Sequence, residues 1–193
     1  MQQNRSSNFT LLNNSEVCEL IYSKEEGRVT GVRILGKRDN DIKCDAVVMC
    51  TGAWTARSLS QLRVRCPVLP LKSYSFDMPT SAAPLNSLLF EDKHFSACYL
   101  KDGLLRVNIF GDLAGFDQSF DARRIRNLLN IVAKTLNAQE AMQNQDLRAV
   151  IIGVSPDDLP LVGRLKHYPN IYLNVGHGAR AATLSFACGS ALG

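Results

Sequence analysis

The sequence predicts an α/β fold into which a second segment, built on an antiparallel sheet, is inserted. Residues 46–54 form an apolar run with a Thr-Gly pair, typical of a parallel strand buried on both faces. Residues 67–110 contain short β-like pieces punctuated by prolines, which indicate an antiparallel sheet. Residues 171–175 form a short strand that runs through Gly176-His177-Gly178 into small residues that favour a helix.

The N-terminal part is expected to contain a β-hairpin. Residues 16–22 and 28–34 each show alternation of apolar and polar side chains, and residues 24–27 between them have turn chemistry. Residues 36–41 form a second polar turn before the apolar run. Residues 55–62, after that run, could form one or two helical turns.

The central part is expected to combine four strands with one helix. The strands fall at residues 72–78, 87–91, 96–100 and 104–109, with a turn at 101–103. Asp121 is a credible N-cap for a helix over residues 122–136, whose apolar positions recur at helical spacing. The chain therefore divides into residues 1–66, an inserted segment at 67–147, and residues 148–193, which return to the first domain.

Composition excludes several classes of protein. A chain of 193 residues with 46% hydrophobic and 21% charged residues is an ordinary globular protein. The net charge of +4 forms no stripe with aromatic residues, so no nucleic-acid partner is expected. Membrane spans need about 18 apolar residues in a row, and no run approaches this length. The six cysteines lack metal-ligand spacing, so we expect no metal site. We expect buried free thiols, which are typical of a reducing intracellular compartment, and favour the cytoplasm over an organelle.

Four stretches of sequence carry a family resemblance by their order and spacing. They comprise residues 28–32 with 44–54, then 70–75, then 105–117, and finally 155–163 with 170–178. Together they resemble the flavoprotein family of D-amino-acid oxidases, glycine and sarcosine oxidases and bacterial D-amino-acid dehydrogenases. The third stretch is most similar to the small subunit of the dehydrogenases. The resemblance covers nearly the whole chain and implies a Rossmann-like FAD-binding domain interrupted by an antiparallel-sheet α+β substrate domain.

One part of that family's pattern is missing from the sequence. Family members open with a βαβ unit whose GxGxxG turn holds the pyrophosphate of FAD, whereas Gly27, Gly31 and Gly36 have the wrong spacing. The resemblance implies that the chain begins downstream of this βαβ unit. FAD is the implied cofactor of the intact family, but this chain should not retain it tightly. The sheet would also have an exposed edge that a partner chain could cover.

Two turns are the implied cofactor-binding positions. In the family, the turn corresponding to Gly176, His177 and Gly178 faces the flavin, where glycines allow close approach and helix-terminal amides favour negative charge. An ordinary glycine-rich turn is the alternative. Thr51 and Gly52 end the apolar strand, and the family's equivalent stretch passes near the cofactor. A simple strand-end turn is the alternative there.

The resemblance also suggests substrate-binding residues. Residues 72–75 resemble a Lys-Gly-Tyr-Ser stretch near the flavin, so Lys72 pairs with the cofactor or a carboxylate, or lies at the surface. Tyr74 is a substrate-binding candidate or a core residue. The family keeps an arginine for the substrate carboxylate shortly before Pro156. Ungapped alignment puts Ile152 there, whereas an insertion at residues 151–154 makes Arg148 the candidate. No catalytic acid or base is assigned.

The expected function follows from this family. The chain is expected to be a fragment or degenerate homologue of an FAD-dependent oxidoreductase that converts D-amino acids to imino acids and then 2-oxo acids, and to be inactive alone. Oxidation of glycine, sarcosine or a similar small amine is one alternative. A non-catalytic binding or regulatory remnant that pairs with a full-length paralogue is the other.

Overall fold

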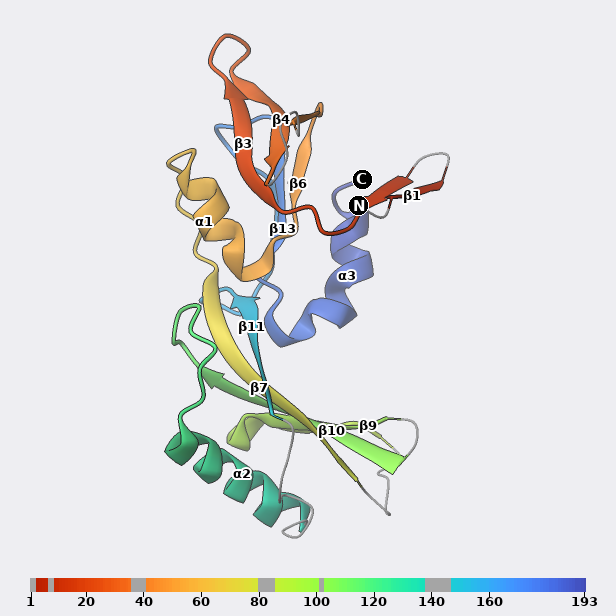
Figure 1. The fold of residues 1–193 in the computed structure, drawn as a ribbon, viewed down its shortest axis with the longest axis vertical. Coiled ribbons are helices and arrows are strands. Elements are labelled where there is room, and N and C mark those ends of the chain that lie inside the picture. Colours follow the sequence, from red (N-terminus) through yellow and green to blue (C-terminus); the bar gives the residue numbers. More distant parts are fainter. Residues whose placement is uncertain (1–2, 7–8, 36–40, 80–85, 101–102, 138–146) are drawn as a thin grey trace. The chain divides into compact units, whose positions relative to one another are not determined.

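The computed structural model describes residues 3–6, 9–35, 41–79, 86–100, 103–137 and 147–193. The chain divides into two compact units (Figure 1). Unit 1 combines residues 1–68 with Val154–Gly193, and unit 2 is Leu69–Gly153. The sequence-based boundary at residue 147 lies earlier because it overlooked strand β11 (Arg148–Val154), which belongs to the sheet of unit 2.

Unit 1 contains the parallel strands that the sequence predicts. Strand β13 (Ile171–Val175) is the centre of a three-stranded sheet, parallel to β6 (Val47–Met49) and antiparallel to β12 (Leu161–Arg164). The predicted hairpin is confirmed by β3 (Val17–Ser23) and β4 (Arg28–Ile34). The remaining strands of the unit are β5 (Asp41–Lys43), which pairs with β4, and the two-stranded ladder of β1 (Gln3–Ser6) and β2 (Phe9–Leu12).

A buried asparagine joins the two sequence-distant parts of unit 1. Asn170 Nδ2 donates to the backbone oxygens of Val29 and Asp45 at 2.6 and 2.9 Å, and its Oδ1 accepts from the Val29 amide at 3.2 Å. Apolar side chains then fill the space between the hairpin and one face of the β6–β13 pair. The core residues are Leu20, Val29, Met49, Leu59, Val68, Ile171, Leu173 and Val175.

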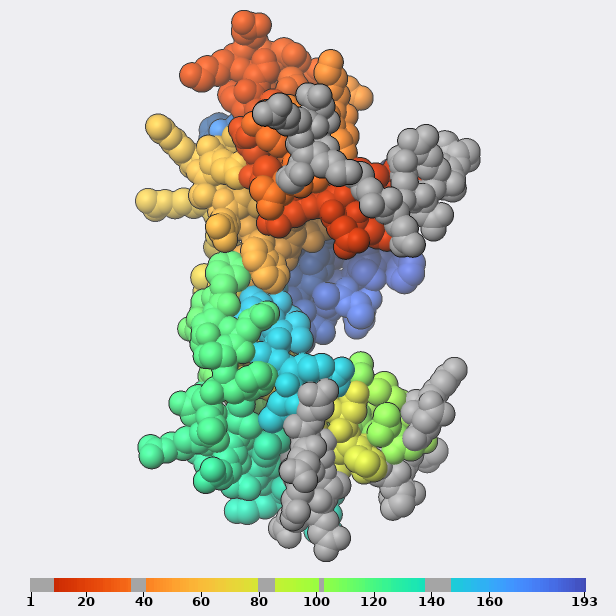
Figure 2. All heavy atoms as spheres, in the orientation of Figure 1, coloured from red at the N-terminus to blue at the C-terminus, as the bar shows by residue number. Residues whose placement is uncertain are grey.

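Helical segments follow both parallel strands of unit 1. After β6 come a 3₁₀ turn (η1, Gly52–Trp54) and helix α1 (Thr55–Ser60), which confirms the predicted helical turns. After β13 come a second 3₁₀ turn (η5, Gly178–Arg180) and helix α3 (Ala181–Ser190). Helix α3 lies at the surface (Figure 2), where Phe186 is 90% exposed. No helix in the described ranges is long and apolar enough to cross a bilayer.

The predicted burial of the apolar run on both faces is wrong. Strand β6 has only three residues, and Val48 at its centre is 50% exposed. The reason is that β6 lies at the edge of its sheet, with β13 as its single described neighbour. Cys50 is exposed for the same reason. All six cysteines are described and free, as predicted, but only Cys188 is buried.

Unit 2 is the predicted antiparallel sheet with one helix on it. The strands run in the order β11–β7–β10–β9–β8, and the pairs β7–β10, β10–β9 and β9–β8 are antiparallel. The bounds of the four not yet given are β7 (Leu69–Pro79), β8 (Leu88–Phe90), β9 (Phe95–Leu100) and β10 (Leu104–Asp112). A short 3₁₀ turn, η2 (Glu91–Lys93), links β8 to β9. Most of the two predicted turns, residues 36–40 and 101–102, lies outside the described residues.

The helix of unit 2 has the predicted bounds and cap. Helix α2 spans Ala122–Leu136, and the Asp121 carboxylate accepts from the Arg124 amide at 2.8 Å. Because α2 is amphipathic, Ile125 and Val132 bury themselves against the sheet. Alternate residues of β7 and β10 form the facing core, namely Tyr74, Phe76, Met78, Leu105, Val107 and Ile109. Asp77 and Arg106 therefore project from the opposite face of the sheet.

Candidate functional site

Five of the predicted cofactor-binding residues meet at one edge of a sheet in unit 1. Strands β6 and β13 are parallel, with Met49 opposite Leu173, so their carboxyl ends lie side by side (Figure 1). Thr51 and Gly52 follow the end of β6, and the turn at 176–178 follows the end of β13. Ligands of open α/β sheets bind at this edge of parallel strands. We call this group of residues the strand-end edge.

The glycines of the strand-end edge are required by the backbone. Gly176 and Gly178 have φ angles of +78° and +55°, in the left-handed region. A Cβ at Gly178 would come within 3.2 Å of Asp158 Oδ1, and one at Gly176 would touch Ser155 and Val68 at 3.5 Å. A Cβ at Gly52, with φ +52°, would meet nothing within 4 Å. The turn after β13 is thus closely packed, whereas the space beside Gly52 is open.

The hydroxyl groups after β6 form a short chain of hydrogen bonds. Thr55 Oγ1 donates to the Gly52 carbonyl at 2.8 Å and lies 2.8 Å from Thr51 Oγ1. Because a hydroxyl has one hydrogen, Thr51 must donate to Thr55. Thr55 is fully buried, so this chain fixes the turn from inside the fold. The Thr51 oxygen keeps acceptor capacity for a ligand.

Two polar atoms at the strand-end edge have no hydrogen-bond partner. They are Asn174 Oδ1 and His177 Nε2, and they are the only such buried side-chain atoms within the described residues. Ile171, Leu173 and Val175 alternate into the core, so Asn174 projects from the other face of β13. Sequence reasoning missed Asn174, although one amide in an otherwise apolar strand was the available signal. Together with the left-handed glycines, these atoms fit a polar, planar ligand such as the flavin ring.

Lys72 is buried and paired with a carboxylate. Its side chain is 5% exposed, and Nζ donates to Asp117 Oδ2 at 3.2 Å and to the Ser119 carbonyl at 2.8 Å. Hydrogen bonds from the Ser119 amide and hydroxyl, and then from Lys72, lower the pKa of Asp117 to about 2. The alternative that Lys72 lies at the surface is therefore wrong, and the alternative that it pairs with a carboxylate agrees with its bond to Asp117.

Tyr74 is a core residue. Its side chain is 1% exposed, and its hydroxyl lies 3.1 Å from Asp112 Oδ2. Burial first, and then the bond to Asp112, raise the pKa of this phenol. Asp112 also accepts from Arg124 at 2.7 Å. The hydroxyl of Tyr74 is therefore engaged within unit 2.

Arg148 belongs to a row of three charges on the open face of the unit 2 sheet. It donates to Asp77 Oδ2 at 2.8 Å, and Arg106 donates to both oxygens of the same carboxylate at 2.7 and 2.8 Å. The hydrogen bond from Arg106 is the main reason that the pKa of Asp77 falls to about 2. Two guanidinium groups and one carboxylate leave one surplus positive charge. Sequence reasoning missed Asp77 and Arg106 because their pairing joins separate strands.

The structure bears on the choice between Arg148 and Ile152. Strand β11 runs without interruption from Arg148 to Val154, so residues 151–154 form strand and no inserted loop. The two side chains lie on the same face because four residues separate them, a distance of about 13 Å along a strand. Arg148 and Ile152 thus occupy opposite ends of one row.

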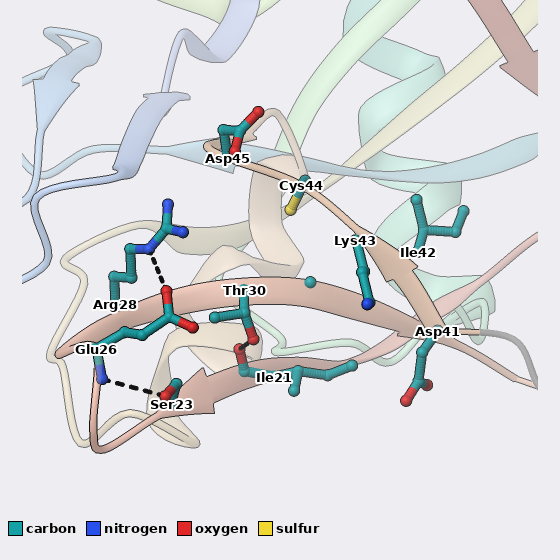
Figure 3. A pocket seen from close by; sticks show the side chains of 11 residues that line it. Ile21, Ser23, Glu26, Arg28, Thr30, Asp41, Ile42, Lys43, Cys44 and Asp45 are labelled. Atoms are coloured by element: carbon teal, nitrogen blue, oxygen red, sulfur yellow. Dashed lines mark hydrogen bonds and ion pairs between the residues drawn. The ribbon is translucent and has the colours of Figure 1, made fainter.

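The surface of unit 1 also contains hollows. A pocket of about 540 Å³ lies on β3, β4 and β5 (Figure 3) and contains none of the predicted site residues. Its charged side chains include the Arg28–Glu26 pair at 2.7 Å, and burial raises the pKa of its Cys44 thiol. A smaller groove of about 120 Å³ lies along β6, lined by Val17, Leu20, Val32, Val48 and Thr51 among others. No group of three potential metal ligands occurs in the described part of the chain.

Known proteins share this architecture. The family model described as DAO, FAD dependent oxidoreductase, matches residues 1–193. Glycine oxidase from Bacillus cereus ATCC 14579 superposes with a TM-score of 0.73 at 18% identity, covering 92% of this chain and 48% of that one. Iminodiacetate oxidase from Chelativorans sp. BNC1 gives 0.74 at 22% identity, with coverages of 92% and 47%. L-Proline dehydrogenase from P. horikoshii gives 0.73 at 18%, with coverages of 92% and 48%. The chain thus spans about half the length of these structures.

Proposed function

Because the chain belongs to the DAO family of FAD-dependent oxidoreductases, we propose that it forms part of an enzyme that oxidises amino acids, with D-amino acids as its substrates. The family uses FAD, which when bound would accept the hydride that leaves the substrate α-carbon. The amine would lose that hydride and a proton to give an imino acid. Water would then convert the imino acid to a 2-oxo acid and ammonia.

The strand-end edge is the observation that carries this proposal. In this proposal the backbone amides of the left-handed glycines after β13 face the ligand, where they would favour developing negative charge. The open space beside Gly52 and the acceptor capacity of Thr51 are compatible with a planar ring at the same edge. In this proposal Gly176, His177 and Gly178 contact the flavin from one strand, and Thr51 and Gly52 contact it from the other.

A second polypeptide segment is part of the proposal. The sequence has no GxGxxG turn, so a further segment or partner chain would hold the pyrophosphate of FAD. The half-exposed Val48 on edge strand β6, and the apolar groove beside it, support a partner strand that pairs there. Without that partner the chain would be inactive.

The assignment of an amino acid as the substrate, in place of an amine without a carboxylate, rests on Arg148. A guanidinium group suits a carboxylate because it can donate two parallel hydrogen bonds, and the cluster with Asp77 and Arg106 carries a surplus positive charge. Lys72 would act indirectly by holding residues 117–119 against the sheet. In this proposal Tyr74 packs in the core and does not bind substrate, because its hydroxyl hydrogen-bonds to Asp112.

Oxidation of glycine, sarcosine or a similar small amine is a second candidate within the same class, since one of the similar structures is a glycine oxidase. Glycine and sarcosine carry the same carboxylate as D-amino acids, so the choice between Arg148 and Ile152 does not separate these substrates. The exposed edge of β6 favours a third candidate, a non-catalytic protein that pairs with a full-length paralogue. One assay separates the three.

The test combines the chain with FAD and a co-expressed polypeptide that carries a strand, a GxGxxG turn and a helix. Candidate substrates are added without oxygen, and loss of the visible absorption of oxidised flavin is followed. D-Amino acids should bleach the flavin, and L-enantiomers should not. Bleaching by glycine or sarcosine alone would favour the second candidate. A stable flavin-containing complex that no amine reduces would favour the non-catalytic protein.

A further inference from the structure

We propose that the side chains of Asn174 and His177 hydrogen-bond directly to the flavin portion of the cofactor, and that both remain unsatisfied until it binds. This inference rests on the proposed use of FAD at the strand-end edge. It assigns a role to Asn174, which neither the sequence motifs nor the glycine turn indicate.

The first argument is the rarity of such atoms. Folded proteins give nearly every buried polar atom a partner, because an unsatisfied one keeps the full cost of leaving water. Within the described residues, Asn174 Oδ1 and His177 Nε2 are the two exceptions. They lie three residues apart, at the junction of β13 and η5. Two unsatisfied atoms so close together, one at the end of the strand and one in the turn after it, indicate that a single ligand satisfies both.

The second argument is the surface that surrounds Asn174. The register pairs Tyr172 with Val48, so the side chains on the non-core face of β13 lie beside those on the same face of β6. Val48 is half-exposed there, and Cys50 is exposed beyond it. The ligand thus meets apolar surface on β6 and polar atoms at the end of β13. A flavin ring has both kinds of surface, since its faces are apolar and one edge carries N–H and C=O groups.

The third argument is the contrast between Asn170, just before β13, and Asn174, near the end of that strand. Asn170 is fully used, with three hydrogen bonds that join β13 to the N-terminal hairpin and the start of β6. Asn174, four residues later, has an oxygen with no partner. The amide oxygen can only accept, so it would take an N–H or O–H of the ligand. The unpaired nitrogen of His177 can donate to a carbonyl or accept, depending on its tautomer.

The experiment compares thermal unfolding of the chain and its variants, with and without FMN as the flavin probe. Asn174→Leu should raise the unfolding midpoint without FMN by about 2–4 °C, because an unsatisfied buried polar group is removed. The same substitution should weaken FMN binding, read from the FMN-dependent rise in midpoint, by roughly fivefold. His177→Leu should produce the same pair of effects.

Asn170→Leu is the matched control. It should lower the midpoint, or prevent folding altogether, because three hydrogen bonds are lost. ADP, which has no flavin ring, should give no rise that depends on Asn174. If FMN stabilises the original chain and Asn174→Leu equally, the side-chain contacts are disproved while the proposed cofactor stands. If FMN stabilises neither protein, the strand-end edge does not bind the flavin ring and the inference is overturned, whereas the proposed function is still decided by flavin reduction in the complex with the co-expressed polypeptide. If Asn174→Leu is less stable than the original chain without FMN, the oxygen already has a partner and the inference is overturned.

Discussion

The ammonium group of Lys72 lies 3.2 Å from the carboxylate of Asp117, although the lysine side chain is 5% exposed and the aspartate side chain 55% exposed. The pair joins a buried charge on β7 to a solvent-facing loop. Removal of Asp117 would therefore leave a buried charge, whereas removal of Lys72 would leave a charge that water can solvate.

Removal of Asp117 should cost more than removal of Lys72. Asp117→Ala leaves a buried ammonium group with the Ser119 carbonyl as its remaining hydrogen-bond partner among the described residues, so we expect this substitution to cause the larger loss in the free energy of unfolding. Lys72→Met replaces the charge with an apolar chain of similar volume and should cost about 1 kcal/mol or less. Urea unfolding measures both. The opposite ranking would contradict this account of the pair.

The protein should lose stability in acid between about pH 4 and pH 2. The pKa values of Asp77 and Asp117 are both lowered from 3.8 to about 2 by their partners in the fold. Because the folded-state pKa lies below the unfolded one, the stabilisation is present above pH 4 and disappears as the pH falls through 2. Asp77→Asn should make the acid limb of the stability curve shallower. Asp92→Asn, on the exposed turn η2, is the control and should leave that limb unchanged.

The edge of β6 should make the chain associate with itself. An exposed apolar strand edge recruits other strands, and Val48 is 50% exposed at the centre of β6. Val48→Lys should reduce the concentration-dependent increase in mass measured by analytical ultracentrifugation. Leu159→Lys, at a loop residue that is 58% exposed, should not. Equal effects of both substitutions would point to general surface hydrophobicity instead.

The isolated chain should not carry FAD through gel filtration. Charge-assisted contacts to the pyrophosphate normally contribute several kcal/mol to the affinity, and the GxGxxG turn that provides them is absent from the sequence. The visible spectrum of the purified chain is the measurement. A stoichiometric flavin peak would mean that the strand-end edge alone is sufficient.

Arg148 should control the concentration of D-amino acid needed for half-maximal flavin reduction in the reconstituted protein. Arg148→Leu should raise it by roughly tenfold or more, about 1.5–3 kcal/mol for a charge-assisted hydrogen bond, with flavin content unchanged. Arg148→Lys should recover part of the loss, because an ammonium group cannot form the planar fork. Arg123→Leu on α2 is the control. An unchanged concentration dependence in Arg148→Leu would favour Ile152 as the aligned position.

Local sequence patterns predicted the elements whose causes are local. The hairpin of β3 and β4, the Asp121 cap of α2 and the strand before Gly176 each depend on a few adjacent residues. Strands β11 and β12 were missed, because β12 is only four residues long and β11 follows a polar stretch without a turn signal. Strand β11 is held in place by β7, which is distant in sequence, whereas β12 pairs with β13, the next strand along the chain.

The sequence predicted the backbone turns of the candidate site but not the hydrogen bonds and burial of its side chains. Glycine spacing indicated the turn at 176–178, but burial decides which polar atoms lack partners, and burial depends on the whole fold. The same applies to Lys72, which is buried by packing around β7, and to the shared carboxylate of Asp77. Exposure of Val48 was missed because an apolar run does not reveal how many neighbours its strand has.

The hydrogen bonds of Asn170 also constrain the order in which the chain can fold during synthesis. They join residues 141 positions apart, so the N-terminal hairpin cannot be locked until the last strand of unit 1 has left the ribosome. Unit 2 is continuous in sequence and emerges entirely before that strand. Unit 2 can therefore fold first, and the apolar face of the hairpin stays exposed until β13 packs against it. In a nascent chain, the N-terminal hairpin is therefore the segment that stays accessible to chaperones and proteases for the longest time.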